Sequence, residues 1–258
     1  MQRDDVAAAL TPEQQHAAGA GAKALMPLPD AAGRARPFLD WMLSGLADVG
    51  VTQVVLVVAP DHAPWTAYYE GEGRPSRVRL RYVVQAEPIG TADAVLAVES
   101  VVPARFLVMN GDNLYPAAAL TALVSGEGTQ CVAFDAATLI REGNIPVERL
   151  RAFARLDLDH DGILRGITEK PADADLARLD WPVSMNLWAF DATIFDACRQ
   201  VPRSTRGEFE LPQAVDRAVR AGAMQVRAIP IAAPVLDLSG RGDVAAVSAM
   251  LRALPVSP

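Results

Sequence analysis

Cysteine, lysine and long apolar runs are all scarce in this sequence. Cys131 and Cys198 are the only cysteines among 258 residues, which excludes a disulfide framework or a cysteine-rich metal site and favours a reducing, cytoplasmic location. No apolar run reaches the roughly 18 residues of a membrane span. The acidic amino-terminal stretch also lacks the apolar segment of a signal peptide. We therefore expect neither secretion nor contact with a membrane.

An excess of positive charge is lacking too, because the formal net charge is −7. This charge argues against a nucleic-acid partner but leaves room for a local cationic pocket that binds a small phosphate compound. Of the 24 lysine and arginine residues, only Lys23 and Lys170 are lysines. This bias toward arginine indicates that these two positions need a compact ammonium group. The alternative is that the two lysines remain by chance on the solvated surface and have no special role.

Helical and strand patterns alternate along the first half of the chain. The run "TQVVLVVAP" is continuously apolar, as in a strand buried on both faces, and it follows a helix predicted over 38–49 and ended by Gly50. The strands "RLRYVVQ" and "RFLVMNGD" then flank a helix capped by Thr91. This order predicts an α/β fold, with a doubly wound, mostly parallel, Rossmann-like sheet and helices on both faces.

The second half has shorter strand signals, which predict a mixed-sheet extension of the same sheet. Candidates are "TQCVAFD", "RAFARLDLD", "GILRGITEKP", "VSMNLWAFD", "QVRAIPI" and "VLDLS", with a clear turn at "DHDG" and a helix at "FELPQAVDRAVRAG". No break in composition divides the chain. We therefore expect one domain over 1–258, with halves of about 1–125 and 126–258.

Two aspartates follow apolar strands at positions suited to a ligand. Asp112 ends the strand of "FLVMNGDNLYP", and Asp237 lies in "APVLDLSGRGD". Open α/β sheets bind ligands at the carboxyl ends of their strands, and Mg²⁺ prefers carboxylate oxygens. The two aspartates are therefore candidate ligands of one divalent cation. An ordinary surface turn is the alternative for Asp112, because Gly-Asp-Asn is also good turn chemistry.

A second candidate segment is "VVQAEPIGTADAVL". Gln85 offers both a donor and an acceptor, as reading a nucleobase edge requires, and the Gly90 and Thr91 amides can flank a base or a sugar. An ordinary connection between a strand and a helix is the alternative. No histidine shows metal spacing and no serine has a convincing histidine partner, so a hydrolase triad is set aside.

Taken in order, these stretches resemble the sugar-1-phosphate nucleotidyltransferases, over about residues 23–243. The resemblance implies that a nucleoside triphosphate and a sugar 1-phosphate react to give a nucleotide-sugar and pyrophosphate, with Mg²⁺ as cofactor and no protein nucleophile. It assigns functions to motifs of this sequence as follows: Lys23 in "KALMPL" to the triphosphate, Gln85, Pro88, Gly90 and Thr91 to the nucleotide, Asp112 and Asp237 to the metal, Glu169 and Lys170 of "EKP" to the sugar phosphate, and Asn186 of "SMNLWAF" to the hexose.

The resemblance also implies that Lys23, Asp112 and Lys170 are the catalytic residues, and that the two halves bind the nucleotide and the sugar phosphate respectively. Family members open with a buried strand and a loop of the form G-x-G-T-R, and this sequence shows neither. We expect either a start codon placed too late or a natural variant, with two strand edges exposed. The alternatives are a non-catalytic binding protein of the same fold and a metal-dependent glycosyltransferase. The base, the sugar and a homo-oligomeric state stay open.

Overall fold

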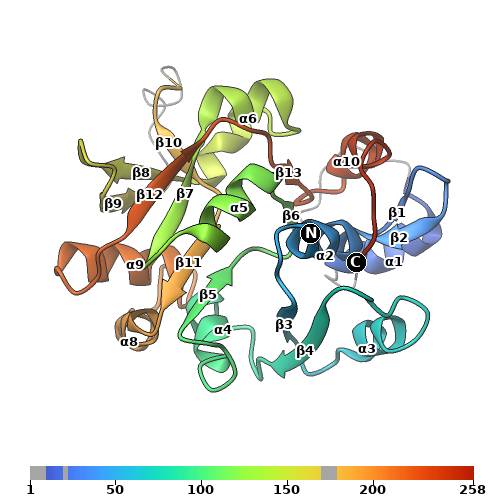
Figure 1. Ribbon diagram of the computed structural model, residues 1–258, viewed down its shortest axis with the longest axis horizontal. Helices are drawn as coiled ribbons and strands as arrows, with labels where there is room; N and C mark the ends of the chain where they lie inside the picture. Colours follow the sequence, from blue (N-terminus) through green and yellow to red (C-terminus); the bar gives the residue numbers. More distant parts are fainter. Residues whose placement is uncertain (1–9, 20–22, 170–178) are drawn as a thin grey trace.

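The computed structural model describes residues 10–19, 23–169 and 179–258 (Figure 1). Its helices are α1 (Pro12–Gly19), α2 (Phe38–Asp48), α3 (Ala63–Tyr69), α4 (Thr91–Ala97), α5 (Ala117–Ser125), α6 (Ala136–Glu142), α8 (Thr193–Gln200), α9 (Leu211–Arg220) and α10 (Asp243–Leu251), with 3-10 turns η1 (Lys23–Leu25) and η2 (Val147–Ala152). Its strands are β1 (Pro27–Pro29), β2 (Ala35–Pro37), β3 (Gln53–Val58), β4 (Arg79–Val84), β5 (Arg105–Val108), β6 (Asn113–Leu114), β7 (Gln130–Asp135), β8 (Ala154–Leu158), β9 (Leu164–Thr168), β10 (Pro182–Ser184), β11 (Trp188–Asp191), β12 (Arg227–Ile231) and β13 (Leu236–Asp237).

The largest sheet has seven strands and helices on both faces. Its order is β5-β11-β7-β10-β8-β9, and β12 pairs with β7. Alternate residues of β7 point to opposite faces, as strand geometry requires. Cys131 and Ala133 join a core cluster with α4, α8 and α9, whereas Val132 and Phe134 join a second cluster with α5 and α6. The expectation of helices on both faces is therefore confirmed for this sheet.

The α/β class is also confirmed, but the pairings do not show a mostly parallel sheet. Within the described ranges, parallel pairing occurs between β3 and β4 and between β7 and β12, and the other strand pairs are antiparallel. The physical reason is β11, which pairs antiparallel with both β5 and β7. Strand β5 lies at one edge of this sheet, and the other strands of the sheet all come from the second half of the chain.

Strands β3 and β4 form a separate two-stranded sheet, apart from β5 in Figure 1. The run "TQVVLVVAP" is a strand as predicted, but the expectation that both faces are buried is wrong. Only Val58 of β3 is buried, and the residues 54–57 are half-buried. The cause is the edge of β3 opposite β4, which has no paired strand within the described residues.

The strand predicted at "VSMNLWAFD" is divided into β10 and β11. Asn186 lies between them with a positive φ of 53°, a conformation that asparagine tolerates better than most residues. The turn at "DHDG" is confirmed, with Gly162 at a φ of 74°. The first turn joins the two strands that flank β7, and the second joins β8 to the edge strand β9.

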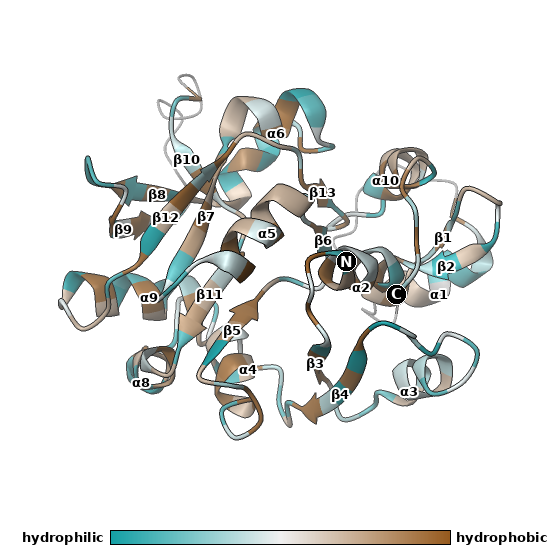
Figure 2. Ribbon diagram, viewed as in Figure 1, coloured by the Kyte–Doolittle hydropathy of each residue, from teal (hydrophilic) through white to brown (hydrophobic). Residues whose placement is uncertain are grey.

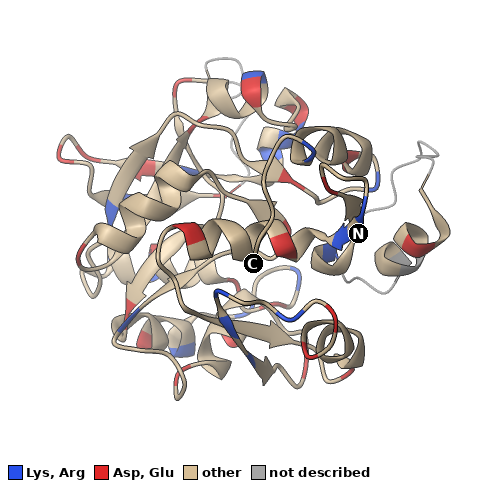
Figure 3. Ribbon diagram, turned by 45° about the vertical axis from the view of Figure 1, so that its right-hand side comes forward, with Lys and Arg blue, Asp and Glu red and all other residues tan. Residues whose placement is uncertain are grey.

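Charge is distributed without a strong local excess on the view in Figure 3, where Lys and Arg segments are interspersed with Asp and Glu segments. No helix in the described parts of the chain is long and apolar enough to cross a membrane.

Candidate active site

Two short strands bring the candidate metal-binding aspartates together. Strands β6 and β13 pair antiparallel, with Asp237 opposite Asn113. One residue earlier, the backbone carbonyl of Asp112 accepts a hydrogen bond of 2.8 Å from the amide of Leu238. The two aspartates are 125 positions apart in sequence, but their backbones are adjacent in the fold.

Lys23 contacts the first of these aspartates. Its Nζ lies 2.8 Å from Asp112 Oδ2, and each side chain is 24% exposed. Lys23 begins η1, and Asp112 follows β5, so this ion pair joins the amino-terminal segment to a strand end. The pair is accessible to a ligand, because neither charge is enclosed by protein.

Asp237 is buried, and three side chains donate hydrogen bonds to its carboxylate. Its Oδ1 accepts hydrogen bonds from Asn113 Nδ2 at 3.0 Å and Ser239 Oγ at 2.5 Å, and its Oδ2 lies 3.1 Å from Arg149 Nη1. Burial raises the pKa of this carboxyl, the nearby charge of Asp112 raises it further, and the donors oppose both effects. The site therefore holds two carboxylates that interact electrostatically.

Arg149 was not predicted from the sequence, although it carries the charge that balances the buried carboxylate. Its second terminal nitrogen lies 2.7 Å from Asp243 Oδ1. The side chain of Asn144 fixes the backbone of Asp237 by donating to its carbonyl at 2.7 Å and accepting from its amide at 2.8 Å. Neither residue belongs to a motif, so only the fold reveals them.

The donor set of this site fits a magnesium ion chemically. Asp112 and Asp237 supply the hard oxygen ligands that Mg²⁺ prefers, and the ion usually uses only one or two protein carboxylates. Their negative charges are balanced here by Lys23 and Arg149. The assignment of the two aspartates as metal ligands stays a prediction.

The candidate nucleotide-binding segment also makes contacts that hold its own loop in place. Gln85 Nε2 donates to the Gly90 carbonyl at 3.0 Å and to Asp93 Oδ2 at 2.8 Å. Gly90 has a φ of 126°, and a methyl group there would overlap the backbone of Phe209. These contacts close the loop onto α4, with Pro88 exposed on its surface. The nucleotide contacts of the segment stay a prediction.

The expectation that Thr91 caps its helix is wrong. Gly90 is the N-cap of α4 and Thr91 is the first helical residue. The Thr91 hydroxyl instead accepts a hydrogen bond of 2.9 Å from the amide of Leu211, the first residue of α9. Thr91 therefore ties two helices together, because a partner 120 residues away in sequence competes with the local cap.

Asn186 lies at the turn between β10 and β11 and lines a cavity together with Asn110 and Gly111. The buried Tyr115 connects this turn to the aspartate site. Its hydroxyl donates to the carbonyl of Met185 at 2.5 Å, and Met185 directly precedes Asn186. The candidate sugar-contacting turn is thus attached to the strand-end segment that carries Asp112.

The structure describes only the first residue of the "EKP" motif, Glu169. Glu169 follows β9, is exposed, and lines a small cavity of about 200 Å³ with Asp216 and Arg217 of α9. Lys170 and Pro171 lie outside the described residues. Their expected contact with the sugar phosphate stays a prediction.

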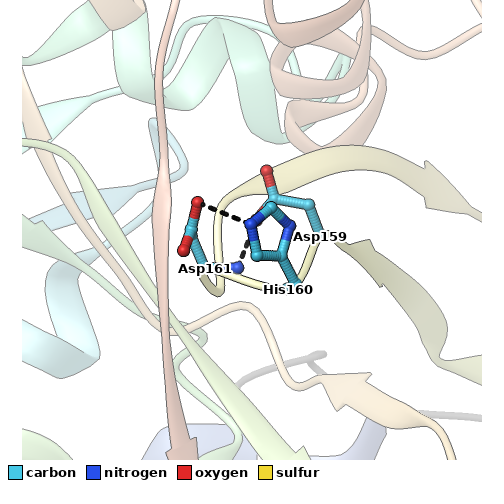
Figure 4. Close-up of side chains that lie close together, drawn as sticks. All are labelled: Asp159, His160 and Asp161. Atoms are coloured by element: carbon cyan, nitrogen blue, oxygen red, sulfur yellow. Dashed lines mark hydrogen bonds and ion pairs between the residues drawn. The ribbon is translucent and has the colours of Figure 1, made fainter.

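A cluster of three side chains at the β8–β9 turn has the composition of a metal site, although sequence spacing predicted none. Ligand atoms of Asp159, His160 and Asp161 lie within 4.8 Å of one another (Figure 4). Asp159 Oδ1, however, accepts hydrogen bonds from the amides of Asp161 at 3.0 Å and Ile163 at 2.9 Å, as an aspartate at a turn does. Turn formation accounts for the cluster, and we assign no metal to it.

Comparisons with known proteins agree on one family. The sequence profile of the family described as nucleotidyl transferase matches residues 21–238. The chain is 29% identical over 187 residues to the UTP–glucose-1-phosphate uridylyltransferase AglF of Haloferax volcanii, covering 72% of each protein. It is 28% identical over 199 residues to a glucose-1-phosphate thymidylyltransferase of Streptomyces antibioticus, covering 73% of this chain and 50% of that protein.

The fold has a solved counterpart. The crystal structure of UDP-glucose pyrophosphorylase complexed with UDP-glucose superimposes with a TM-score of 0.68 at 14% identity, covering 88% of this chain and 89% of that one. At this identity the likeness concerns the fold. The family profile, however, includes η1, both strand-end aspartates and the strands between them, and on this basis the chain belongs to the nucleotidyl transferase family.

Proposed function

We propose that this protein transfers a nucleotidyl group from a nucleoside triphosphate to a hexose 1-phosphate, giving a nucleotide-sugar and pyrophosphate. The single observation that carries the proposal is the meeting of Lys23, Asp112 and Asp237 at two adjacent strand ends. The accessible ammonium group of Lys23 can bind a phosphate oxygen, and the two carboxylates can hold the cation that phosphoryl transfer uses. The relatives whose names specify glucose 1-phosphate support the choice of acceptor.

The reaction follows from the ionisation state of its substrates. A phosphate oxygen of the sugar phosphate attacks the α-phosphorus of the triphosphate in line, and the bond to the β-phosphate breaks as pyrophosphate leaves. The attacking phosphate is already ionised, so no protein nucleophile or base is needed. Bound Mg²⁺, held by Asp112 and Asp237, would stabilise negative charge on the phosphates. Lys23 would bind a phosphate oxygen of the triphosphate.

The remaining site residues belong to the same proposal. Gln85, Pro88, Gly90 and Thr91 are proposed to bind the nucleotide, whereas Glu169, Lys170 and Asn186 are proposed to bind the sugar phosphate. We also propose that the chain forms a single domain with a doubly wound core, and that the protein is cytoplasmic.

The experiment measures pyrophosphate release from the purified protein. UTP and dTTP are each mixed with glucose 1-phosphate and Mg²⁺, with ATP, CTP and GTP as further nucleotides. We expect release that requires both substrates and stops when EDTA removes the metal. Nucleotide binding without pyrophosphate would indicate a non-catalytic protein, and sugar transfer without pyrophosphate would indicate a glycosyltransferase. Either result contradicts the proposal.

A further inference from the structure

Ser239 lies beside the buried carboxylate of the aspartate site, and the proposed reaction gives it no function. It comes shortly after the end of β13 and is half-buried. Its Oγ donates a hydrogen bond of 2.5 Å to Asp237 Oδ1. The same oxygen accepts a hydrogen bond of 3.0 Å from Asn113 Nδ2. Asp237 Oδ1 therefore has two donors, which come from different segments of the chain.

The two oxygens of Asp237 differ in what they can still bind. A carboxylate oxygen has about two lone-pair positions, so the two donors occupy both positions on Oδ1. Oδ2 has one donor among the described residues, Arg149 Nη1 at 3.1 Å, and keeps a free position. Asp237 can therefore give one oxygen to a cation, but it cannot bind a cation with both oxygens.

The turn that carries Ser239 is held on both sides. The amide of Leu238 donates to the Asp112 carbonyl at 2.8 Å, and the amide of Gly240 donates to Asp243 Oδ2 at 2.6 Å. The chain enters β13 through apolar residues, which are brown in Figure 2, and both residues of β13 are buried. Because these surroundings exclude water, only protein donors can occupy the lone pairs of the carboxylate.

We propose that Ser239 is a positioning residue that determines which metal this site prefers, because it restricts Asp237 to one coordinating oxygen and so favours Mg²⁺ over Ca²⁺. Mg²⁺ needs octahedral geometry and uses few protein carboxylates, whereas Ca²⁺ takes roughly six to eight oxygens and often both oxygens of one carboxylate. A rigidly held carboxylate with one free position suits the smaller ion. This inference rests on the proposed binding of Mg²⁺ by Asp112 and Asp237.

The preference is assigned to Asp237 because Asp112 is less constrained. Asp112 is 24% exposed, and among the described residues its carboxylate contacts one donor, Lys23, at Oδ2. Asp112 can therefore bind either ion with one oxygen or with two. A difference between the two ions must then arise at Asp237.

The test measures cation binding rather than activity. Binding of Mn²⁺ to the purified protein is followed by electron paramagnetic resonance, and Mg²⁺ and Ca²⁺ are titrated as competitors to give the ratio of their dissociation constants. Asp237→Asn identifies the binding that belongs to this site, because it removes one ligand. In Ser239→Ala, Oδ1 regains a free lone-pair position, and we expect the ratio to shift toward Ca²⁺ by about tenfold or more. A general folding defect weakens all the cations alike and does not change the ratio.

Two variants serve as controls. Ser239→Thr retains the hydroxyl and should retain the ratio of the unaltered protein. Ser125→Ala removes a hydroxyl that donates to a backbone carbonyl on α5, and it should leave the ratio unchanged.

The possible failures are distinguishable. An unchanged ratio in Ser239→Ala, or an equal shift in Ser239→Thr, would overturn the inference about Ser239 and leave the proposed function standing. If none of the cations binds, or if Asp237→Asn binds them as well as the unaltered protein does, this inference and the proposed metal site both fail.

Discussion

At the scale of single residues, the candidate site depends on a charge balance around Asp237. Burial raises the pKa of this carboxyl, and the Arg149 guanidinium opposes that shift from 3.1 Å away. A carboxyl whose pKa is raised on folding stabilises the protein at low pH, and this contribution is lost as the pH rises through the folded-state value. Arg149 limits that loss, because its positive charge stabilises the ionised carboxylate of Asp237 inside the protein.

Arg149→Gln is therefore expected to destabilise the protein in a pH-dependent way. The free energy of unfolding should fall by about 3 kcal/mol near neutral pH, because a buried carboxylate loses its partner. The loss should shrink toward about pH 4, where protonation removes the charge. Urea unfolding in EDTA at several pH values measures both quantities.

Two further variants make this result specific. Asp237→Asn in the Arg149→Gln background should restore part of the lost stability, because it neutralises one of the two buried carboxylates that Arg149 pairs with, while Asp243 keeps the hydrogen bond from the Gly240 amide. Arg141→Gln, at an exposed pair with Glu142, should change stability by less than about 0.5 kcal/mol. A pH-independent loss, or no recovery in the double variant, would contradict this account of Asp237.

At the scale of elements, Gly90 determines how α4 meets α9. Gly90→Ala combines a positive φ with an overlap against Phe209, and it should lower the free energy of unfolding by about 2 kcal/mol or more. Gly33→Ala is the matched control, since Gly33 has a φ of 78° but open space around it. Urea unfolding of both variants compares a glycine with a φ of 126° and an overlap against one with a φ of 78° and open space, and we expect the larger loss at Gly90. An equal loss in the two variants would contradict this account of Gly90.

Sequence patterns predicted elements well where the determinants are local. The helix over 38–49 appears as Phe38–Asp48, and the apolar run at 53–58 appears as a strand. The division of "VSMNLWAFD" at Asn186 was missed, because a continuous apolar pattern does not reveal a residue with positive φ. The incomplete burial of β3 was missed as well, since burial depends on which strand lies beside it in the fold.

At the scale of the whole molecule, the sequence predicted the α/β class and the family, but not how the sheets divide. The strand ends at Asp112 and Asp237 were singled out from local patterns, and the structure places them on adjacent backbones. Arg149 and Asn144 could not be found in this way, because they reach Asp237 only through the tertiary fold. The antiparallel pairing of β11 with β5 is likewise not encoded by any local pattern.

The measurement that tests the central claim most directly is pyrophosphate release by Asp112→Asn. The change preserves shape but removes the charge proposed to hold Mg²⁺ and to pair with Lys23. We expect a loss of at least about 100-fold in turnover, with the Tm nearly unchanged because Asp112 is partly exposed. Asp161→Asn, at the exposed β8–β9 turn, is the matched control and should keep full activity. Full activity of Asp112→Asn at saturating Mg²⁺ would contradict the proposed site.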